Sequence, residues 1–205
     1  MKNAETFVFK VTLFGTMSSL GSALMTELLK RQHEVIAIVD DLNRLPPRPG
    51  LHNKHAGLDD ADQAEQGVAG ASAVICLLPA LAPHDHPMQL RMVQALVAGM
   101  TRTTIRRLLL VGDFSVLEDP DGYTAQHRQC VEQIADTLQR SSLHWTLINA
   151  PSEIPGLGIE HFQHTHGTLD PSLEEPLQRL ARIAAGMIDI LELKLHYGEQ
   201  LNFVC

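Results

Sequence analysis

Residues 10–21, KVTLFGTMSSLG, join a short apolar segment to the start of an amphipathic helix through two glycines, Gly15 and Gly21. This is the outline of a dinucleotide-binding turn, in which the first glycine allows a tight bend and the last allows close packing of helix on strand. The full motif has a middle glycine where the backbone approaches a pyrophosphate, and this chain has Ser18 there. The Ser18 hydroxyl could cap the helix or donate to a phosphate. Two glycines can also form a strand–helix turn that binds nothing, so the turn alone leaves both interpretations open.

The residues after the turn favour a nucleotide-binding sheet. Leu20, Leu24 and Leu28 have the i, i+4 spacing of a helix packed on a sheet. Residues 35–39 form a continuous apolar run, typical of a parallel strand that is buried on both faces. Asp40 follows directly, where an acid can accept hydrogen bonds from a ribose.

Strand-like and helix-like segments alternate along the rest of the chain. This alternation predicts an α/β fold with a doubly wound, mostly parallel, Rossmann-like sheet in a single domain, residues 1–205. Further strands are expected at residues 52–56, 72–78, 107–112, 144–149 and 201–204, and helices at 60–67, 90–100, 123–140 and 177–191. Residues 150–176 are rich in Pro, Gly and His without periodicity, and we expect a loop-rich segment on the substrate side. Ligands of such sheets bind beyond the carboxyl ends of the strands.

Composition narrows the classes of function. The net charge of −8 and the lack of a basic stripe argue against nucleic-acid binding. No apolar run reaches the ~18 residues that span a membrane, and the N-terminus lacks the apolar core of a signal peptide. The three cysteines are far apart, which suits a reducing compartment. We therefore expect a cytoplasmic protein that binds neither nucleic acid nor membrane, with a homodimer left open.

At the level of the whole chain, the sequence resembles the atypical short-chain dehydrogenase/reductases. The group is the NAD(P)H-binding proteins described as NmrA-like, NADH-flavin reductase-like or biliverdin reductase B-like. The resemblance covers nearly the whole chain and rests on KVTLFGTMSSLGSAL (10–24), HEVIAIVDDLNRLPPRPG (33–50), VAGASAVICLL (68–78), TTIRRLLLVG (103–112), LQRSSLHWTLINAP (138–151) and GEQLNFV (198–204). It implies an oxidoreductase that binds a nicotinamide dinucleotide and reduces a flavin, quinone or similar acceptor. The alternative is a non-catalytic dinucleotide-sensing regulator or interaction protein with a degenerate cofactor site.

The resemblance leaves the choice between NAD(H) and NADP(H) open, with NAD(H) favoured. Members that prefer NADPH commonly carry an arginine directly after the second strand, where this chain has Asp40. Arg44 matches a second arginine of some members and could pair with a 2′-phosphate, which Asp40 would repel. Leu58 and Pro79 depart from the family pattern, as Ser18 does, and these departures favour a weak or lost site. The predicted cofactor contacts are Gly15, Thr16, Met17, Ser18, Ser19, Leu20, Gly21, Asp40, Arg44, Leu78 and Pro79.

Two hydroxyl groups are the candidate catalytic groups. Typical relatives use a Tyr-x-x-x-Lys pair, in which the lysine lowers the pKa of the tyrosine. Here Tyr123 is followed by His127, without a lysine, and Ser115 lies just past the fifth strand, where relatives often present a hydroxyl to the nicotinamide. Either residue could instead be an ordinary surface or loop residue. Reduction of a flavin or quinone can draw protons from water, so it need not depend on Tyr123.

Histidines invite a metal interpretation at two places, His84 with His86 and His161 with His164 and His166. Imidazoles are common zinc ligands, but no carboxylate or thiolate completes an obvious set. We therefore expect no native metal site.

Overall fold

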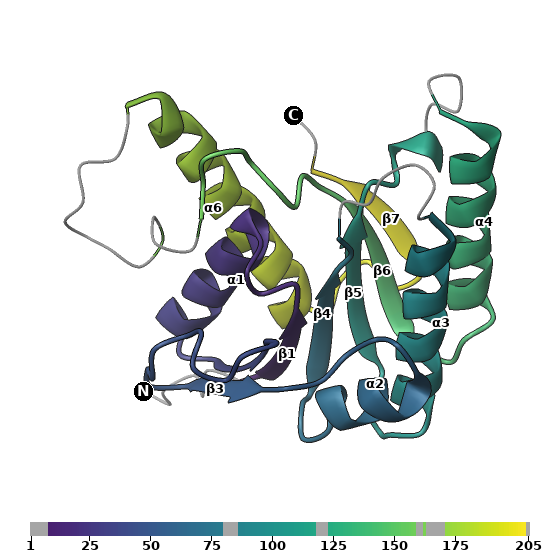
Figure 1. The fold of residues 1–205 in the computed structure, drawn as a ribbon, viewed down its shortest axis with the longest axis horizontal. Helices are drawn as coiled ribbons and strands as arrows, with labels where there is room; N and C mark the ends of the chain where they lie inside the picture. The colour runs from purple at the N-terminus through teal and green to yellow at the C-terminus, as the bar shows by residue number, and fades with distance from the viewer. Residues whose placement is uncertain (1–7, 80–85, 118–122, 159–161, 163–170, 204–205) are drawn as a thin grey trace, which may run out of the picture.

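One parallel sheet organises the molecule (Figure 1). The computed structural model describes residues 8–79, 86–117, 123–158, 162 and 171–203. Its strands are β1 (Lys10–Phe14), β2 (Glu34–Ile38), β3 (Leu51–Lys54), β4 (Ala73–Leu77), β5 (Arg107–Gly112), β6 (His144–Asn149) and β7 (Glu199–Asn202). They lie in the order β3-β2-β1-β4-β5-β6-β7, and every neighbouring pair is parallel. The predicted doubly wound, Rossmann-like fold is confirmed, with the change of direction between β1 and β4.

Helices cover both faces of the sheet (Figure 1). The pair α1 (Ser19–Lys30) and α6 (Pro171–Glu192) packs on one face, and α2 (Ala61–Val68), α3 (His86–Thr101) and α4 (Ala125–Gln139) pack on the other. Because side chains alternate along a strand, Val11 and Leu13 of β1 enter the core under α1 and α6, whereas Phe14 enters the opposite core. The two cores hold the carboxyl ends of β1 and β4 rigidly next to each other.

Several predicted boundaries differ from the structure, among them the start of α3, which is His86 rather than residue 90. Helix α6 begins at Pro171 rather than at residue 177, so the loop-rich segment predicted for 150–176 is shorter. Prolines mark loops in a sequence, but the first turn of a helix needs no intrahelical N–H donors, so it accommodates Pro171. Helix α4 begins at Ala125 rather than 123, because Thr124 caps it by accepting from the His127 N–H at 3.2 Å. The closing strand β7 begins before residue 201 and ends at Asn202.

The structure describes two of the three cysteines and one of the five histidines that were considered as metal ligands. Cys76 and Cys130 are buried free thiols, and burial raises the pKa of Cys76 to about 12, so it stays an unreactive thiol near neutral pH. His86 opens α3, whereas the other four histidines considered as metal ligands lie outside the described residues. Among the residues with described positions, no three metal-ligating side chains come together. No helix in that part of the chain is long and apolar enough to cross a membrane.

Candidate active site

The turn after β1 requires both of its glycines. Gly15 has φ of +77°, and a Cβ there would lie 2.9 Å from the Leu77 Cβ. A Cβ on Gly21 would lie only 2.1 Å from the Gly15 carbonyl oxygen. Gly15 thus makes the bend beside β4, and Gly21 brings α1 against the turn, as the sequence predicted.

Ser18 acts as the N-cap of α1. Its φ of −67° is one that any residue adopts, so the backbone does not need a glycine here. The Ser18 hydroxyl donates to the Gly15 carbonyl at 2.8 Å and accepts from the Gly21 N–H at 2.9 Å. Of the two uses that the sequence left open for this hydroxyl, the structure shows the cap.

The backbone N–H groups of Ser19 and Leu20, at the start of α1, point toward the segment that follows β6. The Leu20 N–H donates to the Ser152 carbonyl at 3.0 Å, and the Ser19 N–H lies 3.4 Å from a carboxylate oxygen of Glu153. The Ser19 hydroxyl donates to a backbone carbonyl at 2.6 Å and accepts from a backbone N–H at 3.0 Å, both within residues 154–157. A helix N-terminus is a ready anion site, and here Ser152 and Glu153 of the same chain lie across it.

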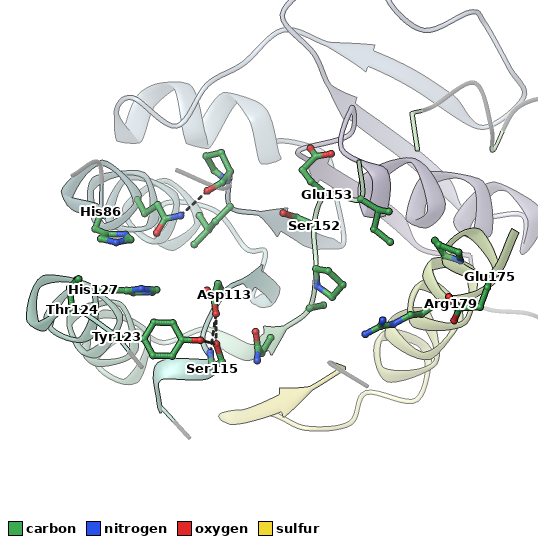
Figure 2. A pocket seen from close by; sticks show the side chains of 18 residues that line it. His86, Asp113, Ser115, Tyr123, Thr124, His127, Ser152, Glu153, Glu175 and Arg179 are labelled. Atoms are coloured by element: carbon green, nitrogen blue, oxygen red, sulfur yellow. Dashed lines mark hydrogen bonds between the residues drawn. The ribbon is translucent and has the colours of Figure 1, made fainter. Parts of the chain in front are cut away.

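Two adjoining clefts open at the carboxyl ends of the strands. The smaller, of about 330 Å³, is lined by Phe14, Gly15, Thr16, Met17, Ser18, Ile38, Val39, Asp40, Gly57, Leu58, Leu77, Leu78, Pro79, Met92, Ser152 and Glu153. The larger, of about 1020 Å³, is lined by Leu78, Pro79, His86, Gln89, Asp113, Ser115, Tyr123, Thr124, His127, Asn149, Ala150, Pro151, Ser152, Glu153, Ile154, Glu175, Pro176 and Arg179 (Figure 2). Four residues, Leu78, Pro79, Ser152 and Glu153, line both clefts.

Most of the predicted cofactor contacts meet in the smaller cleft. They are Gly15, Thr16, Met17, Ser18, Asp40, Leu78 and Pro79. Ser19, Leu20 and Gly21 lie directly behind it in α1, where their side-chain positions are buried. Arg44 is exposed and lines neither of the two clefts. The role of each residue in cofactor binding stays a prediction.

The larger cleft brings both candidate catalytic hydroxyls together (Figure 2). Ser115 lies in the short 3-10 helix η2 (Ser115–Leu117) after β5, and its hydroxyl hydrogen-bonds both the Asp113 carboxylate and the Tyr123 hydroxyl. An ionised carboxylate has no hydrogen to give, so Ser115 donates to Asp113, and Tyr123 donates to Ser115. The sequence named Ser115 and Tyr123 separately, and the structure joins them in one chain that ends at an exposed carboxylate.

Aromatic rings form one wall of this cleft. The Tyr123 and His127 rings meet edge to face with centroids 5.0 Å apart, and His86 stacks on His127 at 4.3 Å with 24° between the planes. His127 therefore contacts the ring of Tyr123 and leaves the hydroxyl to Ser115. Glu175 and Arg179 of α6 face this wall from across the cleft (Figure 2).

Sequence reasoning did not identify Glu153 or Asn149. The buried Asn149 accepts from the Phe114 N–H at 3.3 Å and donates to the Asn202 side chain at 3.3 Å, which fixes the turn that carries Ser115. Glu153 lies in the segment predicted to be on the substrate side, but its contact with α1 joins residues far apart in the sequence. No local pattern marks such a contact.

The model of a protein family described as NAD(P)H-binding matches residues 15–174. The chain belongs to this NAD(P)H-binding family. The match includes both glycines of the turn, Asp40 and the two candidate catalytic residues, and it confirms the resemblance to atypical short-chain dehydrogenase/reductases. No curated protein matches the chain.

Solved structures share the fold. A candidate NADH-flavin reductase from Streptococcus pneumoniae is 21% identical, with a TM-score of 0.65 over 95% of this chain and 98% of that one. A short-chain dehydrogenase/reductase from Veillonella parvula in complex with NADP is 15% identical, with a TM-score of 0.65 over 96% and 94%. The Bordetella bronchiseptica enzyme WbmH in complex with NAD+ is 13% identical, with a TM-score of 0.67 over 96% and 76%. At these identities the likeness concerns the fold.

Proposed function

We propose that the protein is an NAD(P)H-dependent oxidoreductase that reduces a flavin, quinone or similar planar acceptor, with NAD(H) favoured over NADP(H). The observation that carries this proposal is the hydrogen-bonded chain from Tyr123 through Ser115 to Asp113. It opens into a large cleft that shares a wall with the cleft of the dinucleotide turn. A protein that only senses a dinucleotide has no need of such a chain.

The turn fits a nicotinamide dinucleotide. Its two glycines hold positions that a Cβ would fill, and Asp40 lines the same cleft at the end of β2, where it can accept from ribose hydroxyls. When bound, the reduced nicotinamide supplies a hydride. Leu78 and Pro79 line both clefts, so a dinucleotide in the smaller cleft and an acceptor in the larger would meet at this wall.

Tyr123 is placed to handle the proton of the reaction. Reduction of a quinone or carbonyl to the neutral product takes one hydride and one proton. Tyr123 can give its proton to an acceptor oxygen. A proton that the exposed Asp113 takes up from solvent can then return to Tyr123 through the Ser115 hydroxyl. An acceptor that takes its proton directly from water would use the cleft without this chain.

The shape of the larger cleft supports a planar acceptor. Ligand pockets commonly have volumes of ~300–1,000 Å³, and about 1020 Å³ is room for a fused ring system. The rings of His86, His127 and Tyr123 offer stacking and edge contacts to such a system.

A second candidate, a regulator with a weakened cofactor site, is favoured by one observation. The first N–H donors of α1 already have acceptors from the same chain, on Ser18, Ser152 and Glu153. Tight dinucleotide binding would have to replace some of these contacts. This candidate predicts binding without turnover.

The test is NADH oxidation with flavin mononucleotide and with menadione as acceptors, followed by NADH absorbance. We expect turnover in the wild type and loss of turnover in Ser115→Phe, which removes the hydroxyl and places a bulky ring in the larger cleft, while NADH still binds. Ser142→Phe places the same side chain at an exposed position outside both clefts and should keep the activity. Binding of NADH without oxidation by any flavin, quinone or carbonyl would instead establish the regulator.

A further inference from the structure

At the start of α1, acceptors from the same chain occupy the N–H groups that a cofactor phosphate would need. A pyrophosphate at a dinucleotide turn accepts hydrogen bonds from the N-terminal N–H groups of the helix. In this chain the Ser19 N–H faces the Glu153 carboxylate, and the Leu20 N–H donates to the Ser152 carbonyl. The Gly21 N–H donates to the hydroxyl of the N-cap, Ser18. A phosphate can reach these donors only if one of the present acceptors leaves.

Glu153 is the acceptor that can leave most readily. The cap belongs to the turn itself, and the backbone of residues 154–157 is held by the buried Ser19 hydroxyl. The Glu153 side chain is exposed, has rotatable bonds, and makes the longest of these contacts, 3.4 Å to the Ser19 N–H. A rotamer change would withdraw its carboxylate without moving the backbone.

The charge of Glu153 matters more than its two contacts with Ser19, at 3.4 Å to the backbone nitrogen and 3.3 Å to the hydroxyl. The described residues that line the smaller cleft include two acids, Asp40 and Glu153, and none of them is lysine or arginine. A carboxylate and a phosphate compete for the same positive helix end, and they repel each other if both stay. Two like charges about 4 Å apart weaken binding about fivefold even in water, and a pyrophosphate carries more than one charge.

We propose that Glu153 sets the cofactor affinity of this protein by holding a negative charge at the pyrophosphate position of α1. The inference rests on the proposed function, since its ligand is the dinucleotide. It implies that Glu153 is the largest single cause of weak cofactor binding and that the glycine turn itself is intact. The affinity should then follow the charge at residue 153.

The experiment is calorimetric titration of the full chain with NADH and with NADPH, in the wild type, Glu153→Gln and Glu153→Lys. Gln keeps the shape and removes the charge, and Lys reverses it. We expect both cofactors to bind Glu153→Gln about tenfold more tightly than the wild type, and Glu153→Lys more tightly still. The control, Glu132→Gln, removes the same charge from an exposed position of α4 and should change nothing.

Each outcome decides between the two proposals. Measurable binding in Glu153→Gln with none in the wild type supports the inference. Equal or weaker binding in both variants, with measurable binding in the wild type, overturns the inference and leaves the oxidoreductase proposal standing. No binding in any of the three proteins overturns both proposals, because the turn then holds no dinucleotide even without the charge.

Discussion

The two ends of the joined clefts differ in how their polar groups are used. At the turn end, the Ser18 hydroxyl and the first N–H donors of α1 are hydrogen-bonded within the chain. At the tyrosine end, the hydroxyls of Tyr123 and Ser115 lead to an exposed carboxylate and border the larger cleft. Groups for chemistry and groups for cofactor affinity are therefore placed independently along one edge of the sheet.

Gly21→Ala should have the largest effect at the turn end. The new Cβ would lie 2.1 Å from the Gly15 carbonyl oxygen, so α1 and the turn must separate. We expect the free energy of unfolding to fall by about 3 kcal/mol and NADH binding to be lost. Urea unfolding and NADH titration measure the two effects.

Gly70→Ala is the matched control for that variant. Gly70 has φ of +85°, but nothing lies within 4 Å of a Cβ there, so only backbone strain of about 1 kcal/mol is expected. NADH should bind to this variant as to the wild type. Equal losses of stability in both variants would show that the close approach at Gly21 is not what matters.

The sequence predicted the glycine turn well, but it did not predict the contact of Glu153 with α1 or the start of α6. The alternation of strands and helices was sufficient for the fold class. The pattern from β1 to Asp40 was sufficient for five residues of the smaller cleft, because each signal lies within a few neighbouring residues. Glu153 was missed because its contact with α1 is made only when β6 lies beside β5 in the folded sheet. The start of α6 was missed because Pro171 and Pro176 suggest a loop.

Tyr123→Phe should lower the rate with some acceptors and not with others. With a carbonyl acceptor, which needs a proton at its oxygen, we expect kcat to fall ~100-fold. With a flavin, which can be protonated by water, the rate should stay nearly unchanged. Tyr197→Phe removes the hydroxyl of the other tyrosine, which stacks on His144 outside both clefts, and serves as the control. A ~100-fold loss with flavin as well would assign proton transfer to Tyr123 for every acceptor.

Asp40→Arg should change cofactor preference at the turn end. Asp40 lines the smaller cleft and would repel a 2′-phosphate, so the wild type should bind NADH more tightly than NADPH. Arginine there offers a fork to the phosphate, and we expect the ratio of the two dissociation constants to shift about tenfold toward NADPH. Asp41→Arg makes the same charge change at an exposed residue that lines neither cleft. A wild-type preference for NADPH would exclude Asp40 as the ribose ligand.

Ser18→Gly should have the smallest effect, and it tests whether the cap limits the turn. The variant loses the hydroxyl that now accepts from the Gly21 N–H, so that donor becomes free for a phosphate. A glycine N-cap costs only a few tenths of a kcal/mol, whereas Ser18→Ala frees the same donor and should cost about 1 kcal/mol of stability. We expect NADH to bind about threefold more tightly to both variants, the scale of one net hydrogen bond. Weaker binding in both would mean that the hydroxyl turns from its cap to the phosphate when the cofactor arrives, and the two ends would then differ less than the structure indicates.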